Sequence, residues 1–299
     1  MIGPDTTFSV VIPTHDRPVQ LAACLRSLAR LRYPNEAFEV IVVDDGSVTP
    51  LGPVVDEARG SLSLRVLRRP NGGPSAARNA GLAVARGRFV AFTDDDCRPE
   101  PGWLAAFERR LGDDAAALVG GRTVNALVDD PFASTSQLIV DLAVDHYNRD
   151  PEDARFFPAS NLAVARDGLA ALGGFAAELR TAEDRDLCDR WRALGRRLRL
   201  APDAVVLHAH ALDLRSFWRQ HLGYGRGAWR FLRAHQRREG SSTIDAGFYL
   251  RTLRELPGRL AGQRQPARVA ALLALWQLAN TVGFGLEAAR EALGAGGAA

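Results

Sequence analysis

Cysteine is scarce in this sequence. Its 299 residues include only Cys24, Cys97 and Cys188, which lie far apart, and no CxxC or Cys/His spacing of a metal site is present. Three scattered thiols predict a reduced, cytoplasmic compartment. The first ten residues also lack a basic stretch followed by an apolar one, so we expect no signal peptide.

A large charge of one sign is absent as well. The formal net charge is +3, with 46% apolar and 24% charged residues, which is ordinary for a globular protein and argues against disorder. The small positive excess is mostly arginine and is strongest after residue 180. It suits an anionic partner, such as a phosphate or an acidic membrane surface, but a solvated arginine-rich face also explains it. We expect no nucleic-acid partner.

Strand and helix patterns alternate over the first hundred residues. Short apolar, β-branched runs typical of strands alternate with segments that carry apolar residues at helical spacing. This β-α-β-α-β-α-β order predicts an α/β fold with a Rossmann-like, mainly parallel sheet flanked by helices. The expected strands are residues 8–13, 38–43, 62–68 and 88–93, and the expected helices are residues 19–31, 54–59 and about 75–87.

Three polar loops follow the expected strands. They read PTHDR (13–17), DDGS (44–47) and TDDDC (93–97). Because ligands bind beyond the carboxyl ends of the strands in such sheets, this edge is the expected ligand site. A dinucleotide-binding fold would need a glycine-rich first turn, and residues 13–18 contain no glycine, so an oxidoreductase is a weak interpretation.

The triple aspartate at residues 94–96 suits a nucleotide held partly through a metal ion. A diphosphate cannot approach three carboxylates unless a divalent cation lies between them, and Mg²⁺ or Mn²⁺ accepts carboxylate and phosphate oxygens as ligands. In an extended chain Asp94 and Asp96 point to the same side, while Asp95 faces away, toward a ribose or the backbone. A solvated surface turn is the alternative.

Five stretches, in this order, resemble the family 2 glycosyltransferases, which have the GT-A fold. They are SVVIPTHDRPVQLAACLRSL, FEVIVVDDGS, NGGPSAARNAGLAVARGRFVAFTDDDC, ASNLAVARDGLAALGGF and AEDRDLCDRW, and they cover about residues 8–225. The resemblance implies a glycosyltransferase with a nucleotide-diphosphate-sugar donor, a divalent metal ion (Mn²⁺ or Mg²⁺) and inversion at the anomeric carbon. It leaves the base, the sugar and the acceptor open, whether a glycan, a lipid-linked molecule or a small molecule.

The resemblance also assigns residues to the donor site. Pro13, Thr14 and Arg17 match the loop that borders the nucleotide, and Asp44 and Asp45 match the acids that contact base and ribose.

The triple aspartate matches the family's DxD motif. Asp94 and Asp96 are its two ends, with Asp96 as the direct metal ligand and Asp95 between them at the donor. Arg78 lies at an expected helix start near the same edge. It either contacts a phosphate there or is an arginine on the surface of the helix.

An inverting transfer also needs a general base far from the leaving diphosphate. Residues 181–195 read as an amphipathic helix that begins with Glu183 and Asp184. Thr181 as N-cap with Asp184 in a capping-box role explains these acids without catalysis. The family's ED motif instead makes Asp184 the base, with Glu183 orienting the acceptor or acting as the alternative base. Asp186 and Asp189 are expected to be solvated.

Two further pairs match the family pattern. Ser160 and Asn161 match the segment that lines the donor-sugar pocket, although plain turn chemistry also explains them. His208 and His210 end an expected strand, and a neutral imidazole can complete a Mn²⁺ shell. Related enzymes place a histidine here, and His208 fits that position better, but a strand end without metal is the alternative.

After residue 215 the resemblance weakens. The QxxRW string of processive polysaccharide synthases is absent, which favours transfer of a single sugar. The apolar run 269–289 barely reaches the length of a membrane span, and arginines precede it. It predicts a helix that lies on a membrane surface, packs on the catalytic domain or forms a dimer contact. We expect a cytoplasmic protein. If the helix lies on a membrane surface, the protein is peripheral at the inner face of the membrane.

The predicted organisation is a GT-A catalytic domain at residues 1–225 and a helical C-terminal extension at 226–299. Residues 1–100 form the nucleotide-binding half, and 101–225 the acceptor-binding half. Two other functions are alternatives: a non-catalytic nucleotide- or sugar-binding protein, and a metal-dependent nucleotidyl- or phosphotransferase. A binding protein has no need for a distal base, and a phosphotransferase would show a lysine-rich phosphate loop that residues 13–18 lack.

Overall fold

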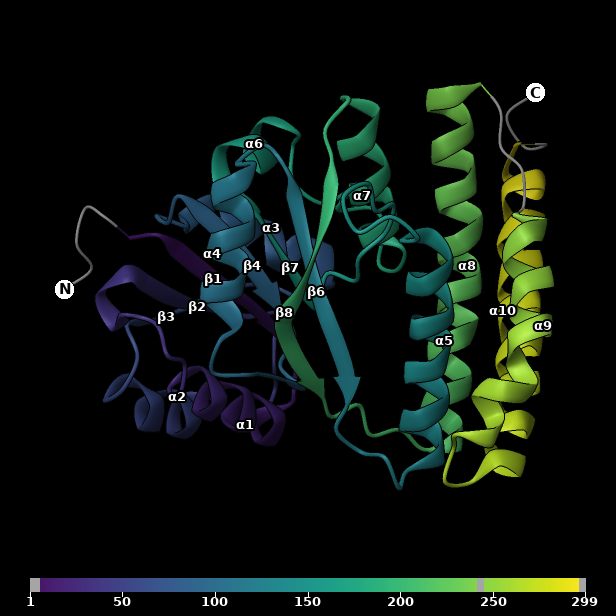
Figure 1. The fold of residues 1–299 in the computed structure, drawn as a ribbon, viewed down its shortest axis with the longest axis horizontal. Coiled ribbons are helices and arrows are strands. Elements are labelled where there is room, and N and C mark those ends of the chain that lie inside the picture. Colours follow the sequence, from purple (N-terminus) through teal and green to yellow (C-terminus); the bar gives the residue numbers. More distant parts are fainter. Residues whose placement is uncertain (1–5, 241–244, 296–299) are drawn as a thin grey trace.

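The computed structural model describes residues 6–240 and 245–295. The strands are β1 (Phe8–Thr14), β2 (Phe38–Asp44), β3 (Leu64–Arg68), β4 (Phe89–Thr93), β5 (Cys97–Pro99), β6 (Leu118–Asn125), β7 (Asn161–Ala165) and β8 (Leu198–His208). They form one sheet in the order β3-β2-β1-β4-β7-β6-β8-β5, with helices packed against it (Figure 1). The expected Rossmann-like α/β fold is confirmed.

The helices continue the pattern that the sequence indicates and add several after residue 100. They are α1 (Pro18–Leu28), the short 3₁₀ helix η1 (Asn35–Ala37), α2 (Gly52–Arg59), α3 (Pro74–Val84), α4 (Trp103–Asp113), α5 (Pro131–Tyr147), α6 (Arg166–Ala171), α7 (Glu183–Ala193), α8 (Leu214–Glu239), α9 (Ala246–Ala261) and α10 (Pro266–Ala295).

The first half of the sheet is parallel and the second half is mixed. β1 pairs in parallel with β2 and β4, and β2 pairs in parallel with β3, so their carboxyl ends meet at one edge. β7 is antiparallel to both β4 and β6, whereas β6 and β8 are parallel. The short β5 pairs with the end of β8, which sets Cys97 opposite His208. That pairing brings the aspartate turn beside the end of β8.

Alternate residues of the central strands pack on opposite faces of the sheet, as the two-residue period of a strand requires. Val10 and Ile12 of β1 join a core with α1, α2 and α4, whereas Val11 joins a second core with α3, α6 and α7. Gly81 of α3 lies so close to β1 that a Cβ there would come within 2.4 Å of Val11. The edge that carries the three polar loops therefore rests on a sheet that is buried on both faces.

A separate helical layer lies beside the second half of the sheet (Figure 1). Leu138 and Leu142 of α5 pack with Val269 and Leu273 of α10 in a third, smaller core. The domain boundary proposed at residues 225/226 falls inside α8, so the division of the chain stays a proposal.

Among the described helices, α10 is long and apolar enough to cross a membrane by length and composition alone, over Pro266–Leu293. Its most apolar window has a mean hydropathy of 1.6, and 22% of that window is buried. Because core helices of soluble proteins pass the same criterion, this is weak support for membrane association.

Candidate active site

The aspartates 94–96 form a tight turn rather than an extended run, since the amide of Cys97 donates to the carbonyl of Asp94 at 3.1 Å. The expectation that Asp94 and Asp96 point to the same side of an extended chain is therefore wrong. Asp94 bonds Arg78, Asp95 bonds Thr14, and Asp96 faces two histidines. The solvated-turn alternative also fails, because Asp95 and Asp96 are buried.

Asp96 and the end of β8 form a group that could hold a metal ion. The Oδ1 atom of Asp96 lies 3.3 Å from Nε2 of His208, and Oδ2 lies 3.0 Å from Nδ1 of His210. The three ligand atoms all lie within 4.8 Å of one another. Nε2 of His210 also lies 2.9 Å from Oε1 of Gln220 on α8, which fixes the orientation of this ring.

The surroundings of Asp96 keep it ionised. Burial acts to raise its pKa, but the hydrogen bonds with His208 and His210 and the charge of Arg17 outweigh burial, and the pKa lies well below its ordinary value. The pKa of His208 is raised: burial acts to lower it, and the carboxylate of Asp96 overcomes that effect.

Arg17 connects the loop after β1 to the aspartate turn. Its guanidinium contacts Asp95 at 2.8 Å and Asp96 at 3.1 Å, and Thr14 donates to the second oxygen of Asp95 at 2.8 Å. Burial, opposed by Arg17, raises the pKa of Asp95 to about 7. Asp95 therefore bonds side chains of the β1 loop, and its contact with the donor stays a prediction.

Asp44 and Asp45, at the end of β2, hold together the loops at this edge of the sheet. Oδ1 of Asp44 accepts from the amide of Ser47 at 2.8 Å. The carboxylate of Asp45 accepts from the amides of Gly72 and Gly73 and from Arg69. Pro13, in β1, pairs in register with Val43 of the neighbouring strand. These residues share one edge of the sheet, and their contact with a nucleotide stays a prediction.

Arg78 is buried, so its interpretation as a surface arginine is wrong. From α3, its guanidinium donates to Glu183 at 2.7 Å and to Asp94 at 2.7 Å. Its Nε atom is buried without a hydrogen-bond partner among the described residues. Arg78 thus links the aspartate turn to the acids of α7.

Glu183 and Asp184 begin α7, but helix capping does not explain them. The N-cap is Ala182 in a left-handed conformation (φ 64°), and Thr181 donates to the carbonyl of Gly223 rather than capping the helix. Oδ1 of Asp184 accepts from the amide of Arg185 at 2.8 Å. Burial and the charge of Asp184 raise the pKa of Glu183 to about 7, and burial also raises the pKa of Asp184.

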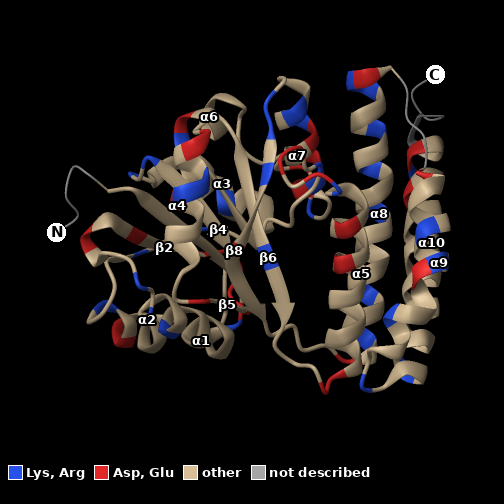
Figure 2. Ribbon diagram, in the orientation of Figure 1, with Lys and Arg blue, Asp and Glu red and all other residues tan. Residues whose placement is uncertain are grey.

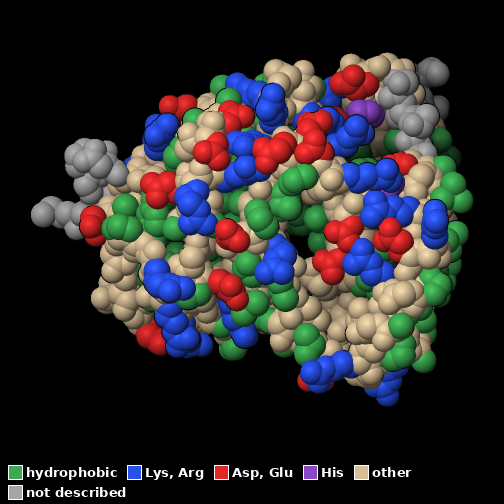
Figure 3. Space-filling view, in the orientation of Figure 1, with side chains coloured by type: hydrophobic (Ala, Val, Ile, Leu, Met, Phe, Trp, Pro, Cys, Tyr) green, Lys and Arg blue, Asp and Glu red, His purple; other side chains and the backbone are tan. Residues whose placement is uncertain are grey.

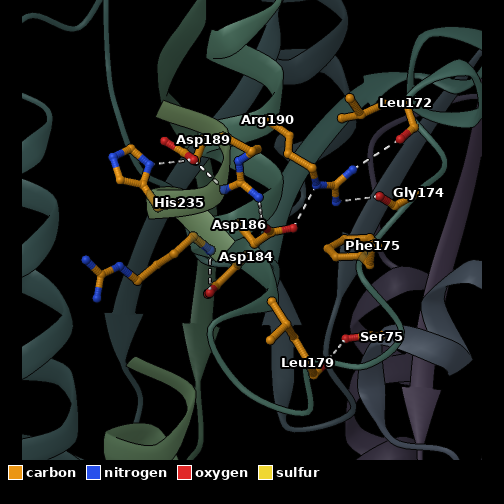
Figure 4. A network of polar contacts seen from close by, with 12 residues as sticks. Ser75, Leu172, Gly174, Phe175, Leu179, Asp184, Asp186, Asp189, Arg190 and His235 are labelled. Carbon is orange, nitrogen blue, oxygen red and sulfur yellow. Dashed lines mark hydrogen bonds and ion pairs between the residues drawn. The ribbon is translucent and has the colours of Figure 1, made fainter. Parts of the chain in front are cut away.

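The expectation that Asp186 and Asp189 are solvated is wrong. Asp186 is buried and bonds Arg190 at 2.7 Å and Arg238 of α8 at 2.8 Å. Asp189 bonds Arg238 at 2.5 Å and His235 at 2.9 Å. Figure 4 shows this network between α7 and α8, next to Asp184. The two helices are therefore held together by charge-assisted hydrogen bonds just behind Asp184.

Ser160 and Asn161 stand at the start of β7, and both are buried. The side chain of Asn161 accepts from the indole of Trp103 at 2.8 Å and donates to the carbonyls of Arg122 and Ala204 at 3.0 Å each. Asn161 thus holds the second half of the sheet together, and a contact with the donor sugar stays a prediction for both residues.

Two residues of α8 were missed by the sequence analysis. Gln220 orients His210, and Tyr224 follows the Gly223 carbonyl that accepts from Thr181 at the start of α7. Desolvation and the charges of Asp184 and Glu183 raise the pKa of Tyr224, so its phenol stays protonated. This segment lacks a QxxRW string, and its signal in the sequence is polar side chains at helical spacing.

Comparisons with known proteins identify the family. A sequence model of glycosyl transferase family 2 matches residues 9–173. The pre-mycofactocin glycosyltransferase of Mycobacterium tuberculosis is 34% identical over 226 residues, which cover 74% of this chain and 46% of that protein. The probable glycosyltransferase YdaM of Bacillus subtilis is 28% identical over 234 residues, which cover 73% and 54%. The chain spans about half the length of these curated relatives.

Solved structures share the fold. A mannosyltransferase from Pyrobaculum calidifontis, in complex with GDP-Man and Mn²⁺, superposes with a TM-score of 0.67 and 21% identity, covering 98% of this chain and 89% of the other. S. aureus TarS 1–349 in complex with UDP-GlcNAc gives 0.57 and 20%, covering 95% and 91%. At these identities the likeness shows the fold alone. Since the family model covers more than half of the sequence, the chain belongs to glycosyl transferase family 2 and has the GT-A fold.

Proposed function

We propose that this chain transfers a single sugar from a nucleoside-diphosphate sugar to an acceptor hydroxyl, with a divalent metal ion and inversion at the anomeric carbon. One observation carries this proposal. A carboxylate with two imidazoles stands on the donor side, and a second, separate pair of carboxylates stands at the start of α7. A protein that only binds nucleotides has no use for the second pair.

The residues on the donor side fit a divalent ion. Asp96, His208 and His210 offer one oxygen and two nitrogen ligands, a set that suits Mn²⁺ better than Mg²⁺, which prefers oxygen ligands throughout. Asp94 is not part of this group, because it bonds Arg78. We therefore propose His210 as a ligand beside His208, and give Asp94 a supporting role. Bound there, the ion would neutralise charge on the leaving diphosphate.

The loops after β1 and β2 would hold the nucleotide. Arg17 lies at the mouth of the aspartate turn with a third of its side chain exposed (35%), where it can meet a phosphate. Asp44 and Asp45 accept hydrogen bonds from the amides of these loops, and in this proposal their carboxylates contact the base and the ribose. The GDP-Man and UDP-GlcNAc named in the two neighbouring structures carry different bases, so the base of this donor is left open.

Asp184 is the general base in this proposal. The acceptor hydroxyl loses its proton to a carboxylate as its oxygen attacks the anomeric carbon, while the bond to the diphosphate breaks on the opposite face. Glu183 is held by Arg78 at 2.7 Å, whereas Asp184 has one oxygen with no side-chain donor among the described residues. A raised pKa suits Asp184 for proton removal near neutral pH. Glu183 then orients Asp184 and the acceptor.

Nucleotide binding tests this function. Calorimetry of UDP, GDP, TDP and CMP, each with and without Mn²⁺, is expected to show tight, Mn²⁺-dependent binding of one diphosphate. Asp96→Asn is expected to abolish it. Asp203→Asn is the matched control, since Asp203 lies on the same strand as His208 but has a solvent-exposed side chain (77%). Folded protein without metal-linked binding of any nucleotide would contradict the proposal.

A further inference from the structure

The outer face of α9 and α10 is apolar and unpartnered in the described chain. We define this outer face by six side chains that are exposed despite their apolar character. They are Tyr249 (44%), Leu250 (69%) and Leu253 (69%) on α9, and Leu278 (55%), Val282 (37%) and Leu286 (49%) on α10. Both helices form one edge of the molecule, and Figure 3 shows hydrophobic side chains gathered along that edge. Monomeric soluble proteins rarely expose contiguous apolar patches of this kind.

The acids of these two helices are all paired within the described residues. Glu287 bonds Arg230 of α8 at 2.9 Å, and Glu291 bonds Trp229 at 2.7 Å and Arg233 at 3.0 Å. Glu255 bonds Arg251 within α9 at 2.6 Å. The outer face therefore carries no free carboxylate within the described residues 246–293.

The exposed charged residues of α9 and α10 without a carboxylate partner, by contrast, are arginines. Arg254 of α9 and Arg268 and Arg290 of α10 are exposed, and none of them has a carboxylate partner in the part of the chain that the structure describes. Arg268 and Arg290 lie 22 residues apart on one helix, roughly 33 Å at 1.5 Å per residue. Figure 2 shows these helices at the edge of the molecule with basic residues along them. An apolar strip with arginines at its ends and side is complementary to an anionic lipid surface.

α10 packs closely on α8, which argues against a spanning orientation of this fold. A Cβ on Gly225 of α8 would meet the Asn280 carbonyl at 2.1 Å, and one on Gly283 of α10 would meet the Leu222 carbonyl at 2.1 Å. The two helices thus touch backbone to backbone. A spanning α10 would have to carry the arginines of α8 into the hydrocarbon, which is costly. If α10 instead lies in the membrane plane, the arginines of α8 do not enter the hydrocarbon, and this cost does not arise.

A second copy of this chain fits the outer face less well. A two-fold dimer would set the same surface against itself, because such an interface is isologous. The only unpaired charges on that surface within the described residues are arginines, so a dimer would bring like charges together with no carboxylate to meet them. Charge therefore favours lipid over a second copy.

We propose that the outer face of α9 and α10 docks onto a bilayer that contains anionic lipids, with α10 lying in the membrane plane. This surface is independent of the proposed donor and base residues, and it would bring the chain to acceptors or products at the membrane.

Flotation with vesicles tests the docking surface. The purified full chain is expected to float with vesicles of equal parts phosphatidylglycerol and phosphatidylcholine, and to float far less with phosphatidylcholine alone. Leu278→Glu is expected to lower the bound fraction at least ten-fold. Leu194→Glu is the matched control, because Leu194 is equally exposed (55%) at the end of α7, outside the outer face. It is expected to float like the wild type.

The arginines give a second readout that does not depend on the apolar substitutions. Arg254→Gln and Arg268→Gln are each expected to lower the affinity for the anionic vesicles about five-fold, since one arginine near such a surface contributes about that factor. Failure of the folded wild type to float, or equal flotation of Leu278→Glu, would overturn the proposal. So would a wild-type dimer in sedimentation that Leu278→Glu dissociates, with no lipid binding, because the face would then be a contact between copies.

Discussion

The two carboxylate clusters of the site differ in the charges that surround them. Asp96 is buried, which acts to raise its pKa, but two imidazoles and the guanidinium of Arg17 hold that pKa well below its ordinary value. Glu183 and Asp184 lie side by side, and burial raises the pKa of both, with that of Glu183 at about 7. Asp96 stays ionised and suits a cation, whereas Glu183 and Asp184 can exchange a proton near neutral pH. The surroundings of these carboxylates, more than the residue type, therefore determine which of them can bind a cation and which can remove a proton.

Removing the base should have the largest effect. Asp184→Asn keeps the shape of the side chain but cannot accept a proton, so kcat is expected to fall about 1,000-fold, within the range of general base catalysis. The measurement is a steady-state transfer assay with the donor found by calorimetry. Asp167→Asn, at an exposed position, is the control (86% exposed). A kcat for Asp184→Asn within ten-fold of the wild type would show that another group removes the proton.

Removing one imidazole should weaken the other cluster by a smaller factor. His208→Ala and His210→Ala are each expected to lower the affinity for Mn²⁺ about 100-fold, because each deletes one of the three proposed ligands. Electron paramagnetic resonance of free Mn²⁺ in a titration measures this without any assay of activity. His235→Ala removes an imidazole from the network between α7 and α8 and should leave the affinity unchanged. If His210→Ala binds Mn²⁺ as tightly as the wild type, His210 is not a ligand, and only Asp96 and His208 remain as proposed ligands.

Gln220 should matter less, because it acts through His210. Gln220→Ala is expected to lower the Mn²⁺ affinity about ten-fold, the lower end of the range for residues that orient a metal-bound histidine. Gln220→Glu, which keeps an acceptor oxygen for the ring, should restore most of that affinity, and Gln277→Ala on α10 serves as the control. An unchanged affinity in Gln220→Ala would mean that β8 alone fixes the ring.

The pH dependence should report the second cluster. A protonated base cannot accept a proton, so kcat/KM is expected to rise with pH and to level off above an apparent pKa near 7, which belongs to the Glu183–Asp184 pair. Glu183→Gln removes a neighbouring negative charge and should lower the apparent pKa of the remaining acid by about one unit. A pH profile that is flat from 5 to 8, or a midpoint that moves upward, would contradict this reading of the pair.

The sequence was informative where local patterns determine structure. The strands of the parallel half follow from short apolar runs, and β1, β2 and β4 lie close to the expected ranges. The acidic loops at their carboxyl ends follow from the topology of a parallel sheet. The separation of a donor-side turn from acids on a later helix came from the family resemblance and not from spacing.

The sequence does not predict side-chain contacts between residues that lie far apart in the chain. Asp186 bonds Arg238, 52 positions later, and Arg78 bonds Glu183, 105 positions later, and no local pattern shows such pairs. The three-residue β5 is too short to carry a periodic signal, yet its pairing with β8 brings His208 to Asp96. His210 could not be separated from His208 by alternation alone, because both positions point the same way from a strand.

The division of work between the two clusters has one direct test. Calorimetry with the nucleoside diphosphate of the donor and Mn²⁺ would be run on Asp96→Asn and Asp184→Asn side by side, with folding checked by circular dichroism. The account predicts that Asp96→Asn loses metal-dependent binding, while Asp184→Asn binds within about two-fold of the wild type and yet transfers sugar about 1,000-fold more slowly. Equal loss of binding in both variants, or retention in both, would contradict it.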